Sequence, residues 1–143
     1  MIARAIPKTG PRRFRLLYVE SDAASIALVE ELLTARKDVA LLHAADVNLG
    51  IKLARSQRPE VILVNVDLPA AGGAMEHLKL LRADPATQAV PVLAISAAAT
   101  PESIAKGLEA GYFLYLAKPL KADPFTQALD YALEFAAVER AEQ

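Results

Sequence analysis

Five short apolar runs alternate with segments whose apolar residues recur at helical spacing, and this alternation most constrains how the chain can fold. The third run, Val61–Val66 (VILVNV), is almost wholly apolar and rich in β-branched residues, which is typical of a central strand covered on both faces. Strands separated by helices pair in parallel, because each helix returns the chain to the edge where the next strand starts. The pattern predicts one α/β domain with a (βα)5 order.

Turn and cap residues set the boundaries of these elements. The strands are predicted at Phe14–Val19, Val39–Ala44, Val61–Val66, Val90–Ser96 and Tyr112–Ala117. The helices are predicted at Ala23–Arg36, Val47–Gln57, Met75–Arg82, Pro101 to a Gly111 cap, and Asp123–Glu139, the last with Asp123 as its cap. We expect a flavodoxin-like, doubly wound parallel sheet with strand order 2-1-3-4-5. Residues 14–143 then form the domain, and residues 1–13 form a basic leader before it.

The composition excludes several classes of function. The 143 residues contain no cysteine, which rules out disulfides, thiol catalysis and cysteine-ligated zinc. A net charge of −1 gives no global basic field for binding nucleic acid. No apolar run approaches the roughly 18–20 residues needed to span a bilayer, and Arg12, Arg13 and Arg15 interrupt any signal-peptide core. We therefore expect a soluble cytoplasmic protein without a nucleic-acid or membrane partner.

Polar side chains gather where the predicted strands end. In an open parallel sheet, sites form beyond the carboxyl ends of the strands. The residues at these ends are Glu20, Ser21, Asp22, Asn65, Asp67, Ser96 and Lys118. Acids, a hydroxyl and a lysine are thus predicted to converge on one edge of the sheet. No glycine-rich phosphate-binding motif accompanies them, and His43 and His77 lie on different elements without matching ligands.

Four stretches carry a resemblance to a known family. They are LLYVESD (16–22), RPEVILVNVDLPAAGG (58–73), ADPATQAVPVLAISA (83–97) and EAGYFLYLAKPL (109–120). In this order and spacing, the chain resembles the receiver domain of two-component response regulators over about residues 14–138. That family is known for an acidic pair, a phosphoacceptor aspartate, a hydroxyl residue and a lysine at successive strand ends. The resemblance implies a phosphorelay signalling module.

The family's positions fall, in chain order, on Glu20, Ser21, Asn65, Ser96, Tyr115 and Lys118. The resemblance makes Glu20 and Ser21 the acidic pair, Asn65 the phosphoacceptor position and Tyr115 the aromatic switch residue. An amide oxygen is a far weaker nucleophile toward phosphorus than a carboxylate, and Ser21 also lacks the expected carboxylate. Magnesium prefers oxygen ligands that include carboxylates. We therefore expect no cofactor and weak or absent magnesium binding.

Three charged residues have alternative interpretations. Asp67 is expected to cap the turn before the following proline, and the alternative is a displaced phosphoacceptor. Asp22 is expected to be the N-cap of the first helix. Without a phosphate to bind, Lys118 is expected to pair with Glu20 and to donate to Asn65 or backbone carbonyls. Glu20, Asp22 and Asp67 remain the weak candidates for metal ligands.

Tyr112, Phe113 and Leu114 are three large apolar residues at the entry to the last predicted strand. If they are exposed, they form a patch of the kind that marks protein interfaces. The alternative is that the long final helix, with apolar residues from Phe125 to Phe135, folds over them. The resemblance favours an interface, because receivers commonly pair through helix 4, strand 5 and helix 5.

The function expected from these residues is a degenerate receiver that acts as an adaptor without phosphorylation and is not an enzyme. Its expected partner is a signalling protein, a histidine kinase or a second copy of the chain. One alternative is an active receiver that is phosphorylated at Asp67 or Asp22. Another is that the chain is the receiver portion of a hybrid histidine kinase.

Overall fold

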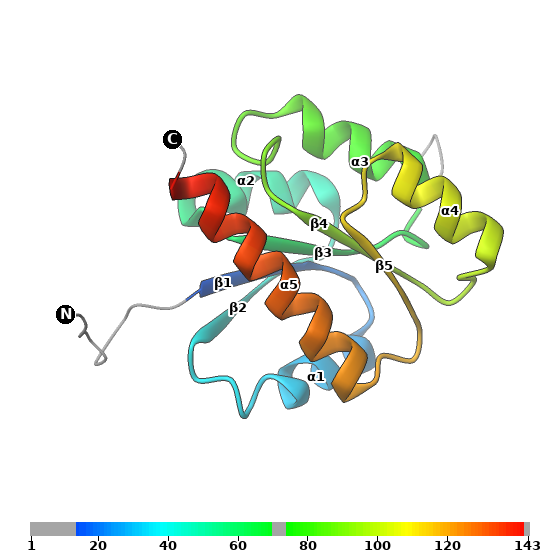
Figure 1. The fold of residues 1–143 in the computed structure, drawn as a ribbon, viewed down its shortest axis with the longest axis horizontal. Helices are drawn as coiled ribbons and strands as arrows, with labels where there is room; N and C mark the ends of the chain where they lie inside the picture. The colour runs from blue at the N-terminus through cyan, green and yellow to red at the C-terminus, as the bar shows by residue number, and fades with distance from the viewer. Residues whose placement is uncertain (1–13, 70–73, 142–143) are drawn as a thin grey trace.

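Five parallel strands form a sheet in the order β2-β1-β3-β4-β5 in the computed structural model, which describes residues 14–69 and 74–141 (Figure 1). The strands are β1 (Phe14–Val19), β2 (Val39–Ala44), β3 (Val61–Asn65), β4 (Val92–Ser96) and β5 (Leu114–Ala117). The helices are α1 (Ala23–Leu32), α2 (Val47–Gln57), α3 (Ala74–Ala83), α4 (Pro101–Ala110) and α5 (Ala122–Ala141). The predicted flavodoxin-like (βα)5 fold and its strand order are confirmed. The predicted leader at 1–13 and the loop at 70–73 lie outside the described residues.

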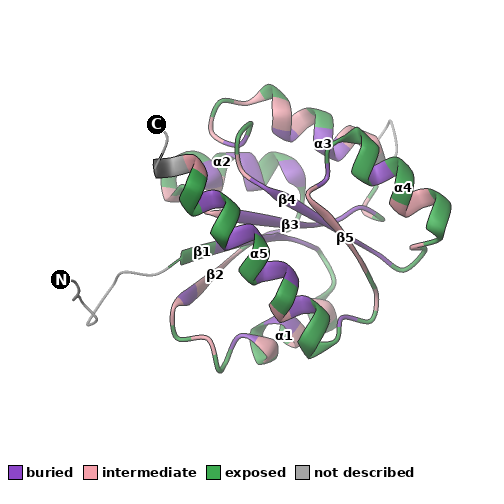
Figure 2. Ribbon diagram, viewed as in Figure 1, coloured by how far each residue is buried: buried purple, intermediate pink, exposed green. Residues whose placement is uncertain are grey.

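Helices cover both faces of the sheet, with α1 and α5 on one face and α2, α3 and α4 on the other (Figure 1). Alternate strand residues face the two layers. In β1, Leu16 and Tyr18 join the core under α1 and α5, whereas Leu17 and Val19 join the core under α2 and α3. Every residue of β3 and β4 is buried (Figure 2), which explains why the run at 61–66 is nearly all apolar. The end of β3 therefore lies at the centre of the sheet.

Caps fix the helix starts beside the carboxyl ends of the strands. Asp22 is the N-cap of α1, as predicted, and its carboxylate accepts the Ser25 N–H at 2.9 Å. Thr100 caps α4 and forms a capping box with Ser103. Gly111 ends α4, also as predicted, with a φ of 125° that residues with a side chain rarely adopt. These caps hold α1 and α4 against the edge where the candidate site lies.

Several predicted helix boundaries differ from the observed ones by one to four residues, and two of these differences have a clear physical cause. Helix α1 ends at Leu32 and not at Arg36, because the chain turns there and the Arg36 guanidinium pairs with Asp38. Helix α5 begins at Ala122, so that Asp123 lies inside the first turn and is not the cap. The carbonyl of the preceding lysine accepts the first helical hydrogen bond instead. The proline that follows fits in this first turn, where a missing N–H breaks no helical bond.

The residues at the entry to β5 are buried or half-buried, so of the two alternatives the structure favours burial over an exposed patch. Tyr112 belongs to the end of α4, because its N–H donates to the Gly107 carbonyl at 3.1 Å, and only 3% of it is exposed. Phe113 and Leu114 are half-buried. The ring of Phe113 packs against that of Phe135 on α5, with centroids 5.1 Å apart, so the final helix covers part of this entry. Large exposed apolar side chains lie instead on α5 itself.

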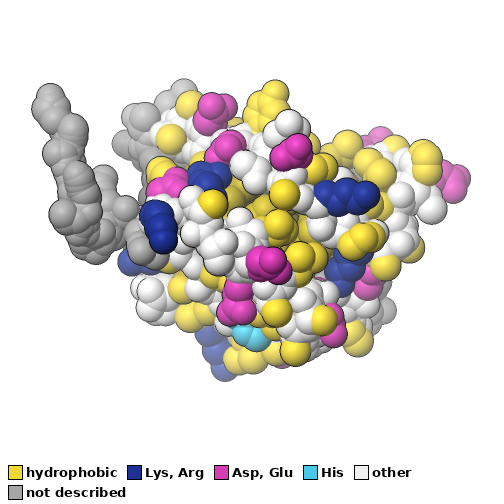
Figure 3. Space-filling model, turned by 90° about the horizontal axis from the view of Figure 1, so that it is seen from below, with side chains coloured by type: hydrophobic (Ala, Val, Ile, Leu, Met, Phe, Trp, Pro, Cys, Tyr) yellow, Lys and Arg dark blue, Asp and Glu magenta, His cyan; other side chains and the backbone are white. Residues whose placement is uncertain are grey.

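The surface carries charges of both signs. On the face shown in Figure 3, acidic and basic side chains are interspersed among apolar ones. The face in Figure 3 therefore has no large region of a single charge.

In the part of the chain that the structure describes, no helix is long and apolar enough to cross a membrane.

Gly107 of α4 makes room for the ring of Tyr115. A Cβ at position 107 would lie 2.5 Å from Cε2 of Tyr115. We predict that Gly107→Ala lowers the free energy of unfolding by about 1–3 kcal/mol, because the ring must leave this position. In a Tyr115→Ala background, the same change should raise stability by up to about 1 kcal/mol, since alanine is the better helix former. Urea denaturation measures the change in the free energy of unfolding in both backgrounds. If Gly107→Ala lowered it equally in the two backgrounds, the clash with the Tyr115 ring would be contradicted.

Candidate functional site

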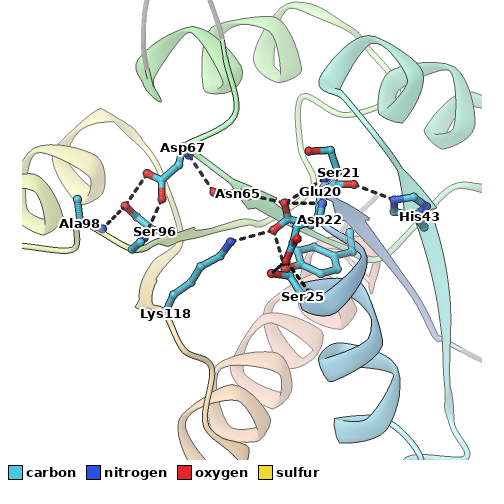
Figure 4. Close-up of polar contacts among 12 residues, drawn as sticks. Glu20, Ser21, Asp22, Ser25, His43, Asn65, Asp67, Ser96, Ala98 and Lys118 are labelled. Atoms are coloured by element: carbon cyan, nitrogen blue, oxygen red, sulfur yellow. Dashed lines mark hydrogen bonds and ion pairs between the residues drawn. The ribbon is translucent and has the colours of Figure 1, made fainter.

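Side chains from the carboxyl ends of β1, β3, β4 and β5 meet in one polar network (Figure 4). Glu20 follows β1, Asn65 ends β3, Ser96 ends β4 and Lys118 follows β5, while Asp67 lies two residues beyond β3. The parallel register of the four strands places these ends at the same edge of the sheet. The structure therefore brings these five predicted site residues together.

Glu20 is a buried carboxylate, with 1% of the residue exposed. Its Oε1 accepts hydrogen bonds from the Tyr18 hydroxyl and the Lys118 ammonium, both at 3.1 Å. Its Oε2 accepts Asn65 Nδ2 at 2.9 Å and the backbone N–H groups of the next two residues at 3.0 and 3.2 Å. A carboxylate has about four lone-pair sites, so these donors satisfy Glu20 fully. The predicted pairing of Lys118 with Glu20 is confirmed.

The ionisation of Glu20 is set by opposing effects. Burial by itself raises the pKa of this carboxyl, but hydrogen bonds from Asn65, Lys118 and a backbone N–H, with the Lys118 charge, outweigh it. The pKa of Glu20 therefore lies below its usual range. Burial, followed by the charge of Glu20, raises the pKa of the Tyr18 hydroxyl. The network thus holds Glu20 as an anion and Tyr18 as a neutral donor.

The amide of Asn65 has one orientation that suits both of its neighbours. Its Nδ2 donates to Glu20 and its Oδ1 accepts the Asp67 N–H, each at 2.9 Å. The opposite orientation would set Oδ1 against a carboxylate oxygen and the NH₂ group against an N–H. Asn65 is 6% exposed, and its own carbonyl accepts the Leu68 N–H at 3.2 Å. Asn65 therefore closes the turn after β3 and connects it to Glu20.

Asp67 extends toward β4, which corrects the expectation that it caps the turn before Pro69. Its Oδ1 accepts the Ser96 hydroxyl and its Oδ2 accepts the Ala97 N–H, each at 2.8 Å. The buried Ser96 hydroxyl oxygen in turn accepts the Ala98 N–H at 2.9 Å. Asp67 itself is exposed, so its carboxylate lies at the solvent end of the network. The bond geometry makes Asp67 a link between the turn after β3 and the turn after β4.

The remaining predicted site residues contribute less. Ser21 reaches the network through its backbone N–H. The Asp22 carboxylate accepts the hydroxyl and the N–H of Ser25, which lowers the pKa of Asp22. The ring of Tyr115 packs edge-on against that of Tyr112, with the ring centroids 6.1 Å apart. Tyr115 adds no hydrogen bond to the described network. Tyr115 therefore belongs to the packing between α4 and β5.

Three contributors to the site are missed by reasoning from the sequence. Tyr18 supports Glu20, and the signal was the period of two along β1, which places both side chains on one face. His43 lies on β2 beside β1, and its Nε2–H donates to the Glu20 carbonyl at 2.7 Å. The Ala97 N–H has no sequence signal, because any residue at that position would supply it. The available clue for His43 was its position near the end of a predicted strand, where polar residues of neighbouring strands meet.

The donors around Glu20 do not fit a divalent cation. Within residues 14–69 and 74–141, no group of three or more His, Cys, Asp or Glu side chains is placed to hold a metal ion. Magnesium takes oxygen ligands in near-octahedral geometry. A cation beside Glu20 would instead meet the ammonium of Lys118 and the NH₂ group of Asn65.

The fold and the site define a class of protein, a flavodoxin-like domain with an acid, a hydroxyl and a lysine at the carboxyl edge of its sheet. The family model of the response regulator receiver domain matches residues 16–130 of the chain. The chain belongs to this family, whose members are signalling modules of two-component systems.

Curated relatives agree with this assignment, and solved structures share the fold. The transcriptional regulatory protein AfsQ1 of Streptomyces coelicolor is 32% identical over 106 residues, which are 74% of this chain and 45% of that protein. Chemotaxis protein CheY4 of Vibrio cholerae has a TM-score of 0.74 at 22% identity, over 85% of this chain and 99% of that one. The receiver domain of a sensor histidine kinase from Pseudomonas aeruginosa, solved with magnesium in its active-site cleft, has a TM-score of 0.70 at 26% identity, over 85% and 98% of the two chains. The chain spans 29–54% of the length of AfsQ1 and three further curated relatives.

Lys118→Met tests the charge that faces Glu20. We predict a loss of about 1–3 kcal/mol in the free energy of unfolding at neutral pH, because Glu20 stays buried without its counter-charge. The pKa of Glu20 is lower in the folded state than its usual value of about 4.3. The stability that ionised Glu20 contributes is therefore fully present above that usual value, and it is lost as the pH falls through the lower pKa of the folded state. The difference between wild type and variant should therefore shrink in acid.

Urea denaturation at a series of pH values measures this difference. Lys121→Met is the matched control, because Lys121 is exposed on the same segment and its loss should change stability by no more than about 0.5 kcal/mol. A loss in Lys118→Met that does not depend on pH, or that the control shares, would contradict the pairing.

Proposed function

We propose that this chain is a receiver module that signals without phosphorylation, acting as a non-enzymatic cytoplasmic adaptor for a protein partner. The observation that carries the proposal is the position of Asn65. It ends β3 with its amide bonded to Glu20 and to the Asp67 N–H. The partner is a signalling protein, a histidine kinase or a second copy of the chain.

The chemistry of phosphoryl transfer supports this proposal. A receiver that accepts a phosphoryl group needs an anionic oxygen to attack phosphorus, and a neutral amide does not provide one. Glu20 is an anion nearby, but it is buried and both of its oxygens already accept hydrogen bonds. Lys118, which would neutralise phosphate charge, is paired with Glu20. Weak or absent magnesium binding forms part of the same proposal.

The main alternative is phosphorylation at Asp67 or Asp22. Both carboxylates already accept hydrogen bonds, Asp67 from the β4–α4 turn and Asp22 from Ser25 at the start of α1. Hydrogen bonds to an anion hold its charge and reduce its nucleophilicity. The hybrid-kinase alternative concerns what else the full protein contains, and it leaves the chemistry of this site unchanged.

A small acyl phosphate with magnesium tests the proposal directly. We predict that the intact mass of the wild type gains no acid-labile phosphate. Millimolar magnesium should leave the melting temperature unchanged, because ligand binding to the native state raises stability by RT ln(1 + [L]/Kd) and a tight site would be visible. A stoichiometric acid-labile adduct would overturn the proposal, and peptide mapping would then assign it to Asp67 or Asp22.

The double variant Ser21→Asp/Asn65→Asp is the positive control. It restores the carboxylates of the family pattern and should recover magnesium binding and the phosphate adduct. Asn65→Asp alone should recover less. It should also lose stability in metal-free buffer, because two carboxylates would then face each other where Nδ2 now lies 2.9 Å from Glu20.

A second copy of the chain is the partner that the surface favours. Tyr131, Phe135 and Val138 are 65%, 40% and 56% exposed, and their spacing places them on one face of α5. We call these three residues the α5 stripe. Leu108 of α4 is a further large apolar residue on the surface, 45% exposed. Glu134 is exposed beside this stripe. An apolar stripe can pack against its own copy across a two-fold axis, as a homodimer that includes α5 requires.

Tyr131→Ser/Val138→Asp tests this interface. We predict that the wild type dimerises at high protein concentration and that the variant stays folded but monomeric. Each large apolar side chain contributes roughly 1.5–3 kcal/mol when buried, so two losses should weaken the dimer by more than about tenfold. Ala137→Asp, an exposed change on α5 outside the stripe, is the matched control. Sedimentation velocity decides the outcome, and a monomeric wild type would contradict self-association.

A further inference from the structure

A hollow of about 400 Å³ lies between α1 and the chain that follows β5, and its walls are mainly apolar. Tyr18 of β1 and Ile95 of β4 line it from the sheet, Leu28 lines it from α1, and Pro119 and Leu120 line it from the chain after β5. We call this hollow the α1 pocket. Its volume lies within the range of roughly 300–1,000 Å³ that is usual for small-molecule sites. The pocket therefore has the size and the apolar lining of such a site.

Lys118 gives the α1 pocket a polar group with unused hydrogen-bonding capacity. Its side chain lines the pocket, and an ammonium group has three N–H donors. Within residues 14–69 and 74–141, its hydrogen-bond acceptor is Oε1 of Glu20, at 3.1 Å, and Figure 4 shows Lys118 extending toward that carboxylate. The ammonium therefore keeps donors for an acceptor that enters the pocket.

The charge of Glu20 decides which kind of acceptor suits Lys118. Oε1 of Glu20 accepts both the Lys118 ammonium and the hydroxyl of Tyr18, and these two donor residues line the pocket. The pocket therefore lies beside an ion pair whose two charges already cancel. A ligand anion next to Lys118 would be repelled by Glu20, because like charges at short range disfavour each other. An uncharged oxygen would accept from Lys118 without this repulsion.

We propose that the α1 pocket binds an uncharged, largely apolar small molecule with one acceptor oxygen, which accepts a hydrogen bond from Lys118. The apolar part of this molecule packs against Leu28, Ile95 and Leu120. The bound molecule connects α1 with the chain after β5, because it contacts both. The inference goes beyond the proposed function, since it concerns a ligand and does not depend on whether Asn65 can be phosphorylated.

Heptanol, the straight-chain primary alcohol, is the probe, because it combines one uncharged oxygen with a short apolar chain. We expect heptanol to shift the methyl NMR signals of Leu28, Ile95 and Leu120 saturably in the wild type. Nuclear Overhauser effects between the heptanol chain and these methyl groups should confirm that it lies in the pocket. Heptanoate has the same chain length and a negative charge, so it should bind at least about tenfold more weakly.

Ala24→Phe should abolish the saturable shifts, because Ala24 lines the pocket and its exposed position on α1 accommodates a larger side chain. Ala27→Phe is the matched control. Ala27 is exposed on the same helix and does not line the pocket, so this variant should bind heptanol as the wild type does. Lys118→Met should lower the affinity for heptanol by about threefold to tenfold, because one hydrogen bond is lost.

Three results would overturn the inference. The first is a wild type whose Leu28, Ile95 and Leu120 methyl signals do not respond saturably to heptanol, a measurement that needs no variant to fold. The second is heptanoate that binds as tightly as heptanol, since the charge of Glu20 would then not select the ligand. The third is a folded Ala24→Phe variant that binds heptanol as the wild type does. The acyl phosphate experiment has a separate readout, so failure of the proposed function would be recognised independently.

Discussion

The buried charge of Glu20 is the constraint on which the rest of the site depends. An unpaired carboxylate in a protein interior costs several kcal/mol, so a residue that is 1% exposed must find donors on every side. The donors come from β1 and the residues after it, from the end of β3, and from Lys118 after β5. Lys118 supplies the positive charge among them. One anion thereby connects three strand ends through hydrogen bonds from protein groups.

Asn65 is the residue that makes such an arrangement possible. An aspartate at this position would bring a second carboxylate within hydrogen-bonding distance of Glu20, and each would raise the pKa of the other. The amide instead gives a donor to Glu20 and an acceptor to the Asp67 N–H. The asparagine amide therefore serves both of its neighbours at once.

The fold was predictable because apolar periodicity and strand ends are local properties of a sequence. Part of the site was predictable too, namely that Glu20, Asn65, Ser96 and Lys118 meet, since the ends of neighbouring parallel strands lie at the same edge. The contacts of Asp67 were not, because its partner Ser96 lies 29 positions along the chain and the direction of the intervening turn decides whether they meet. Tyr112 was misplaced for a similar reason. The apolar pattern after Gly111 does not reveal that the Tyr112 N–H donates to the Gly107 carbonyl of α4. Strand β5 therefore begins only at Leu114.

Helix α4 is held at both of its ends. Its first turn is bonded to the β4–α4 turn that Asp67 engages, and near its last turn Gly107 lies against the ring of Tyr115. A helix fixed in this way packs against β5 in one arrangement. The α5 stripe is already exposed, so under the proposed function no covalent event is needed to expose it. Binding would be governed by the concentrations of the chain and its partner, because mass action alone shifts the equilibrium when the binding-competent state is already populated.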